Sequence, residues 1–184
     1  ECIENNECLD VDVDADSRYQ FLLAKNLIEG NENIEKDIEK GIKYLEQSAS
    51  QGYIESIVYY CQMLIKGDII PKDELKAKKF LIMYLKENNG KIFNLYGKIL
   101  KKEKKYSDAR KFFSDGSNVG NGESMYEYGK MLFLGKGGDS NVVDSIKYFE
   151  LAKNCGNLKS ATFLSVYNKM NQIECFQKIP IKIQ

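Results

Sequence analysis

The chain has 184 residues, enough to bury a sizeable core, and its 27 basic and 27 acidic residues give a formal net charge of zero. It contains no histidine and no C-x-x-C pair, which argues against a zinc site and leaves catalysis almost without candidate residues. No apolar run approaches the length of about 18 residues that a transmembrane helix requires, so no membrane span is predicted.

Residues 1–16 form an acidic leader that contains seven acidic residues and no basic one. The simplest interpretation is a solvated linker, and the alternative is an extended segment that packs on the first helices. An Asp-x-Asp-x-Asp run beginning at Asp10 has the spacing of a calcium loop. That loop needs Gly and Glu where this sequence has Ala15 and Phe21, so no calcium site is predicted.

After the leader, apolar residues recur four apart in successive short segments, which predicts a series of helices joined by turns. Asp16 or Ser17 would cap the first of them. The helices are predicted, with approximate bounds, over residues 17–28, 38–51, 55–66, 73–87, 92–103, 106–118, 123–134, 142–154 and 158–170. Residues 171–184 place isoleucines around Pro180, and we expect them to form a tail that covers the end of the fold.

The chain repeats itself, because IKYFELAKNCG from Ile146 nearly copies IKYLEQSASQG from Ile42. In the second helix of each copy, a small residue is followed by an aromatic residue and then by a Gly or Asn that accepts a left-handed backbone. These positions are Gly41, Ala77, Ala109 and Ser145; Tyr44, Phe80, Phe112 and Tyr148; and Gly52, Asn88, Gly120 and Gly156. Each copy is therefore predicted to end its second helix at the Gly or Asn.

The first helix of each copy has its own pattern, a large apolar residue followed directly by a small one and then by Leu three positions later. These positions are Tyr60, Tyr96 and Tyr128; Cys61, Gly97 and Gly129; and Leu64, Leu100 and Leu132. Gly30, Gly67 and Gly135 are predicted to end first helices. The sequence therefore predicts an all-α fold in which pairs of antiparallel helices stack and bury one continuous core.

This pattern resembles the Sel1-like repeat, a relative of the tetratricopeptide repeat. The matching residues are the turn residues Asp37 and Asp73, the lysines Lys40 and Lys76, the first-helix glycines Gly129 and Gly135, and Ala152. The resemblance covers roughly residues 17–170, as about four units and a final helix, although the third unit (about 92–123) lacks the turn glycine. It implies a right-handed α-solenoid and a non-catalytic adaptor or scaffold for proteins or peptides.

The resemblance also bears on the compartment and on the parent protein. Some secreted members of the family carry a cysteine pair in each unit, whereas this chain has five cysteines and no such pairs. A cytoplasmic location is therefore expected, with the ER lumen or secretion as the alternative. The chain begins with Glu1 rather than Met, so we expect a piece of a longer protein, and a regulatory region fused to an enzyme is an alternative function.

In the family's geometry, the first helices line a concave face on which a partner would lie. The partner-binding residues predicted from it are Tyr59, Gln62, Lys66, Asn94, Lys98, Lys101, Tyr126 and Lys130, and Glu127, Phe133 and Leu134 share the face. Lysines among aromatic residues favour an extended peptide with acidic side chains or a free carboxylate. The alternative is an ordinary solvated face.

The charge distribution adds another alternative, because residues 1–55 carry a net charge of −9 and residues 56–184 carry +9. The acidic leader would then occupy the basic face of its own or a neighbouring chain. Only Arg18 and Arg110 are arginines, so a nucleic-acid partner is not expected. The glycine-rich turn Gly135–Gly138 lacks the spacing of a phosphate loop, so neither a cofactor nor an enzyme activity is predicted.

Overall fold

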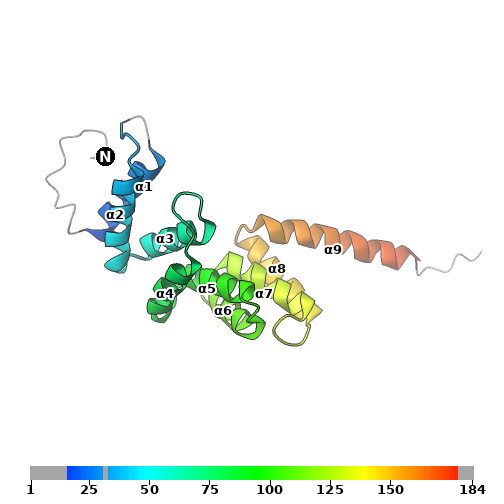
Figure 1. The fold of residues 1–184 in the computed structure, drawn as a ribbon. Helices are drawn as coiled ribbons and strands as arrows, with labels where there is room; N and C mark the ends of the chain where they lie inside the picture. Colours follow the sequence, from blue (N-terminus) through cyan, green and yellow to red (C-terminus); the bar gives the residue numbers. More distant parts are fainter. Residues whose placement is uncertain (1–15, 31–32, 178–184) are drawn as a thin grey trace, which may run out of the picture. The chain divides into compact units, whose positions relative to one another are not determined.

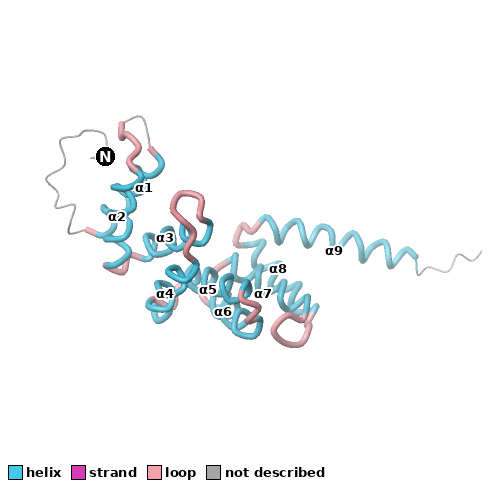
Figure 2. The backbone as a smooth tube through the Cα atoms, in the orientation of Figure 1, coloured by secondary structure: helices cyan, strands magenta, loops and turns pink. Residues whose placement is uncertain are grey.

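The computed structural model describes residues 16–30 and 33–177, and these residues form nine α-helices, one 3₁₀ turn and no strand (Figure 1). The helices are α1 (Ser17–Glu29), α2 (Ile38–Ser50), α3 (Ile54–Lys66), α4 (Glu74–Met83), α5 (Gly90–Lys102), α6 (Tyr106–Asn118), α7 (Gly122–Leu134), α8 (Val142–Asn154) and α9 (Leu158–Gln177), and the 3₁₀ turn is η1 (Leu85–Glu87). Short loops join them (Figure 2). The predicted leader, apart from Asp16, and the last residues of the predicted tail lie outside the described residues.

The chain divides into two compact units, Glu1–Lys86 and Glu87–Gln184. In the first unit, α1 packs on α2, α2 on α3 and α3 on α4. Gly41 of α2 lies close to α1, because a Cβ atom there would lie 2.7 Å from Cγ1 of Ile28 and 3.0 Å from the carbonyl oxygen of Ala24. The small residue in the first turn of this second helix is therefore required by contact with the side chain and backbone of α1.

A polar cluster joins α2, α3 and α4 beside this core. The Lys76 ammonium lies 3.0 Å from Oε1 of Glu46 and 5.1 Å from the centre of the Tyr60 ring, and the Tyr60 hydroxyl donates to the same carboxylate. Burial raises the pKa of Glu46, but the hydrogen bonds from Tyr60 and Lys76 and the Lys76 charge outweigh it and hold this pKa below its usual value. The cluster therefore links three helices through one carboxylate.

In the second unit, α5 packs on α6, α6 on α7, α7 on α8 and α8 on α9. Leu100, Ala109, Phe113 and Met131 form a buried cluster at its centre, which the half-buried rings of Tyr96, Tyr106, Phe112 and Tyr128 surround. Tyr96 meets Phe112, and Tyr128 meets Tyr148, each with ring centres 4.7 Å apart and nearly perpendicular planes. The aromatic residues that recur in the sequence thus pair the two helices of the third and of the fourth copy.

Asparagine and aspartate side chains begin most of the helices. Asp37 and Asp73, the residues at the family's turn position, accept hydrogen bonds from the backbone N–H groups of Lys40 and Lys76. Asn89, Asn121, Asn141 and Asn157 make the same kind of bond at α5, α7, α8 and α9. A local side-chain contact therefore marks the start of each of these six helices, whereas α3 and α6 begin without one.

The predicted left-handed positions are confirmed. Gly52, Asn88, Gly120 and Gly156 have φ angles of 88°, 50°, 83° and 81°. In the third copy, whose turn lacks glycine, Lys104 takes a positive φ of 62° instead. The helix bounds also follow the prediction closely, except that α4 ends early at Met83 and α9 continues to Gln177 rather than residue 170. The sequence has no Gly or Pro after Met170 until Pro180, so nothing there breaks the helix.

Candidate protein-binding surface

The predicted site residues fall into the two units. Tyr59, Gln62 and Lys66 lie on α3 of the first unit. The Tyr59 hydroxyl donates to Oε1 of Glu29 over 3.5 Å, and its ring meets that of Phe21 edge-on at 6.1 Å. Burial, followed by the charge of Glu29, raises the pKa of Tyr59. Tyr59 therefore ties α3 to α1, whereas Gln62 and Lys66 are exposed.

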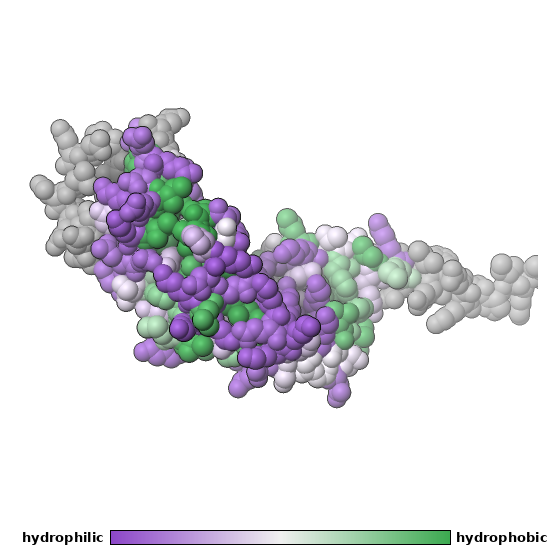
Figure 3. All heavy atoms as spheres, in the orientation of Figure 1, coloured by the Kyte–Doolittle hydropathy of each residue, from purple (hydrophilic) through white to green (hydrophobic). Residues whose placement is uncertain are grey.

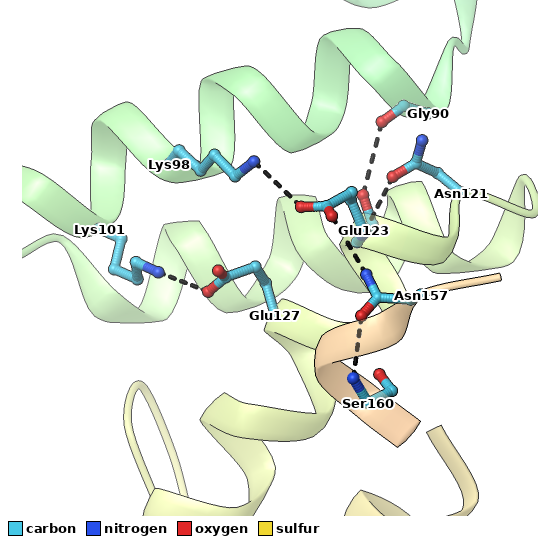
Figure 4. Close-up of polar contacts among 9 residues, drawn as sticks. Gly90, Lys98, Lys101, Asn121, Glu123, Glu127, Asn157 and Ser160 are labelled. Carbon is cyan, nitrogen blue, oxygen red and sulfur yellow. Dashed lines mark hydrogen bonds and ion pairs between the residues drawn. The ribbon is translucent and has the colours of Figure 1, made fainter. Parts of the chain in front are cut away.

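In the second unit, ion pairs connect α5 to α7 (Figure 4). The Lys98 ammonium lies 3.4 Å from Oε2 of Glu123, and Lys101 pairs with Glu127. Oε1 of Glu123 accepts a hydrogen bond of 3.1 Å from the amide of Asn157, the residue that caps α9. One row of polar contacts thus runs across α5, α7 and the start of α9.

Two predicted residues contribute to packing. Asn94 is buried on α5, and its amide nitrogen has no hydrogen-bond partner among the described residues. Tyr126 is half-buried on α7, where its ring lies 5.7 Å from that of Phe149 and the Lys159 ammonium stands 6.0 Å from its centre. Neither side chain is as open to a partner as Lys130, which is exposed on the same helix as Tyr126.

Lys130 borders a pocket of about 260 Å³ in the second unit. Met131 and Leu134 supply its apolar part. Its polar lining consists of Lys101, Tyr106, Glu127, Lys130 and Lys136. Lys101 is paired with the buried Glu127, and the Lys136 ammonium lies 5.4 Å from the centre of the Tyr106 ring. Lys130 has no carboxylate partner within the described ranges, so the pocket presents excess positive charge.

A second feature lies where α7 meets α9. The Phe133 ring centre is 5.3 Å from that of Phe163 and 6.3 Å from that of Tyr167, both on α9. Phe163, Val166, Tyr167 and Met170 are spaced as neighbours on one side of a helix, and Val166 and Met170 are 53% and 59% exposed. These four residues and Phe133 are called the α7–α9 apolar surface. Figure 3 shows hydrophobic residues at the molecular surface where α8 and α9 lie.

The sequence interpretation placed Lys101, Lys130 and the adjacent Phe133 and Leu134 on one face but missed Tyr106 and Lys136. Those two come from the start of α6 and from the turn after α7, outside the first helices. It also missed the residues of α9. The same repeat offsets, counted from Ser160, would have indicated Phe163, Val166 and Met170, because Ser160 aligns with Ser124 of the previous copy.

Metal sites and membrane-spanning helices are two other features that would bear on function. No group of three or more His, Cys, Asp or Glu side chains is placed to hold a metal ion within this part of the chain. None of the helices described is both long and apolar enough to cross a bilayer. The features described in the second unit are the pocket, the ion pairs and the α7–α9 apolar surface.

Comparisons with known proteins agree with this architecture. A Sel1 repeat protein from Oxalobacter formigenes has a similar structure, with a TM-score of 0.79 and 16% identity over 85% of this chain and 64% of that one. A protective antigen present in uropathogenic Escherichia coli strains, which displays an SLR fold, matches with a TM-score of 0.72 and 19% identity over 81% of this chain and 32% of that one. This chain thus spans less than two thirds of either structure.

At these identities the structural likeness concerns the fold, and it confirms the predicted all-α solenoid class. A search of curated proteins finds no match. The Sel1 repeat model matches residues 17–53, 54–83 and 122–157, and leaves out the third copy, whose turn departs from the pattern. Because the three matched repeats cover more than half of the residues, the chain belongs to the Sel1 repeat family.

Proposed function

We propose that this chain is a non-catalytic scaffold that binds a protein or peptide carrying acidic residues. Sel1 repeats typically mediate interactions between proteins. The binding surface would be the α5–α7–α9 face, defined as Lys98, Lys101, Lys130, Leu134 and the α7–α9 apolar surface. The observation that carries the proposal is that three helices, connected by side-chain contacts, carry the half-buried Lys98 and Lys101, the exposed Lys130 and exposed apolar residues that the core does not use.

The lysines of this face differ in their freedom to bind. Lys98 and Lys101 already pair with Glu123 and Glu127 on α7. Lys130 has no such partner within residues 16–30 and 33–177, so a carboxylate of a partner would meet its charge without displacing another ion pair. Lys130 is therefore the lysine on which binding of an acidic partner should depend most.

The test uses the full chain as bait, with mass spectrometry to identify proteins that co-purify. Lys130→Glu should weaken capture of a specific partner while leaving the thermal midpoint of unfolding nearly unchanged, because the side chain is exposed and unpaired. Lys111→Glu, an exposed charge reversal on α6 outside the pocket, is the matched control. A second variant, Val166→Ser with Met170→Ser, removes exposed apolar area from α9.

Lys98→Glu is a poorer choice for this test, because it would place a second carboxylate beside Glu123 and lower stability as well as binding. If a partner binds to the Lys130 variant and to the α9 double variant as well as it binds to the wild-type chain, the α5–α7–α9 face is not the binding surface. A role as the regulatory region of a larger enzyme and occupation of the face by the acidic leader stay predictions, since the described residues do not bear on either.

A further inference from the structure

The pocket and the α7–α9 apolar surface meet along one side of α7. Phe133 and Leu134 lie three and four positions after Lys130, so both are neighbours of Lys130 on that side of the helix. Leu134, which is 51% exposed, lines the pocket together with Lys130, while Phe133 meets the rings of α9. The two features are therefore adjacent, and an occupant of one lies next to the other.

The charges in the pocket are unequal. Glu127 is buried and neutralises Lys101, which leaves the ammonium groups of Lys130 and Lys136 without a carboxylate among the described residues. The Lys136 ammonium rests near the ring of Tyr106, a contact that it can keep while it attracts an anion. Because Met131 and Leu134 line the rest of the pocket, the site favours a carboxylate on a short stem over a free hydrated ion.

Resting on the proposed function, we propose that the pocket and the α7–α9 apolar surface form one bipartite site for a peptide in which an acidic residue lies close to a large apolar residue. The acidic side chain enters the pocket beside Lys130 and Lys136. The apolar side chain covers Val166 and Met170 next to Phe133. Lys130 and Phe133, as neighbours on one helix face, are about 5–6 Å apart, and an extended peptide advances about 3.3 Å per residue. An acidic residue beside Lys130 and an apolar residue that reaches Phe133 are therefore one to three residues apart in the peptide.

The test measures fluorescence anisotropy of labelled eight-residue peptides on the full-length chain. In the first peptide, two glutamates directly precede a leucine–phenylalanine pair. The second replaces the glutamates by glutamines, the third replaces the leucine–phenylalanine pair by serines, and the fourth replaces the glutamates by phosphoserines. The wild-type chain should bind the first peptide about fivefold more tightly than the second. This ratio is at the upper end of the gain in affinity that one exposed ion pair provides.

The variants separate the two halves of the site. Lys130→Glu should abolish the preference for glutamate over glutamine and keep the preference for the apolar pair over serines. Val166→Ser with Met170→Ser should do the reverse, because both residues are exposed and belong only to the apolar half. Lys111→Glu and Val143→Ser, at an exposed lysine and at a valine that is 70% exposed, are the matched controls and should change neither preference.

Three outcomes would overturn the inference. The first is equal binding of the glutamate, glutamine and serine peptides by the wild-type chain. The second is an equal loss in the Lys111 and Lys130 variants, which would indicate net charge rather than a pocket. The third is a Lys130-dependent preference for phosphoserine over glutamate, which would make the pocket a phosphate site. If the peptides fail but a co-purified partner still depends on the α9 double variant, the proposed function stands without this site.

Discussion

Ser145 places a hydroxyl group at a repeat position where the other copies have none. It occupies the small-residue position that is Gly41, Ala77 and Ala109 in the other copies. Its side chain is fully buried, and its hydroxyl has no hydrogen-bond partner in the described part of the chain. A buried donor without a partner costs free energy that an alanine at the same position would not.

Ser145→Ala should therefore raise the free energy of unfolding, by about 1 kcal/mol. Ser48→Ala is the contrasting control, because the buried Ser48 hydroxyl donates to the carbonyl of Ser17, and its loss should destabilise the chain. Urea unfolding followed by circular dichroism measures both. Equal destabilisation by the two substitutions would mean that the Ser145 hydroxyl makes an important contact.

At the scale of elements, Glu46 connects three helices and makes stability depend on pH. Its pKa is lowered in the folded chain from a value near 4.5, so the folded state favours the carboxylate. A group of this kind stabilises the fold above its unfolded pKa, and the contribution is lost as the pH falls through the lower folded pKa. Lys76 and Tyr60 keep their charge states throughout this acidic range.

Thermal midpoints measured from pH 7 down to pH 3 test this contribution. The wild-type chain should lose stability more steeply than Glu46→Gln below about pH 4.5, because glutamine has no proton to gain. The glutamine keeps most of the shape and one acceptor for Tyr60. Parallel pH profiles for the two proteins would show that Glu46 is not an important source of acid sensitivity.

Gly129 is an element-scale requirement of another kind, since it lets α7 approach α8. A Cβ atom there would lie 3.2 Å from the carbonyl oxygen of Ser145 and 3.4 Å from the ring of Phe149. Gly129→Leu should lower the free energy of unfolding by about 3 kcal/mol, because the larger side chain forces the helices apart. Lys147→Ala, which removes only an exposed pair with Asp144, should stay within about 0.5 kcal/mol of the wild type.

Denaturation midpoints of these two variants give the comparison directly. A Gly129→Leu protein as stable as the wild type would mean that the α7–α8 spacing adjusts without cost. The contrast is informative because both residues belong to the same helix pair, and Gly129 is buried whereas Lys147 is exposed. In a stacked array, a helix pair that is forced apart also weakens its contacts with the neighbouring pairs.

At the scale of the whole molecule, α9 corresponds in the repeat to the first helix of a copy. Ser165 and Asn168 are exposed on it, whereas the corresponding Cys61 and Leu64 of α3 are buried. Polar residues at these positions tolerate water where the other copies place a second helix. The same helix exposes Val166 and Met170, which belong to the α7–α9 apolar surface.

The sequence by itself determined the helix pairs, their order and most of their bounds. These features are local: an Asn or Asp side chain caps the next turn, as at Asp37, and a Gly or Asn accepts a positive φ, as at Gly52 and Asn88. Apolar residues four apart then define the buried side of each helix. Repetition strengthened each assignment, because most copies carry the same signals at similar offsets.

The tertiary structure alone decided which predicted binding residues are free. Lys98 and Lys101 are paired because Glu123 and Glu127 on the next first helix come within reach, and Asn94 is buried although it shares their helix. The pocket includes Lys136 and Tyr106 because a turn and a second helix meet α7 there. Such contacts depend on distances between elements far apart in the chain, which no local pattern specifies.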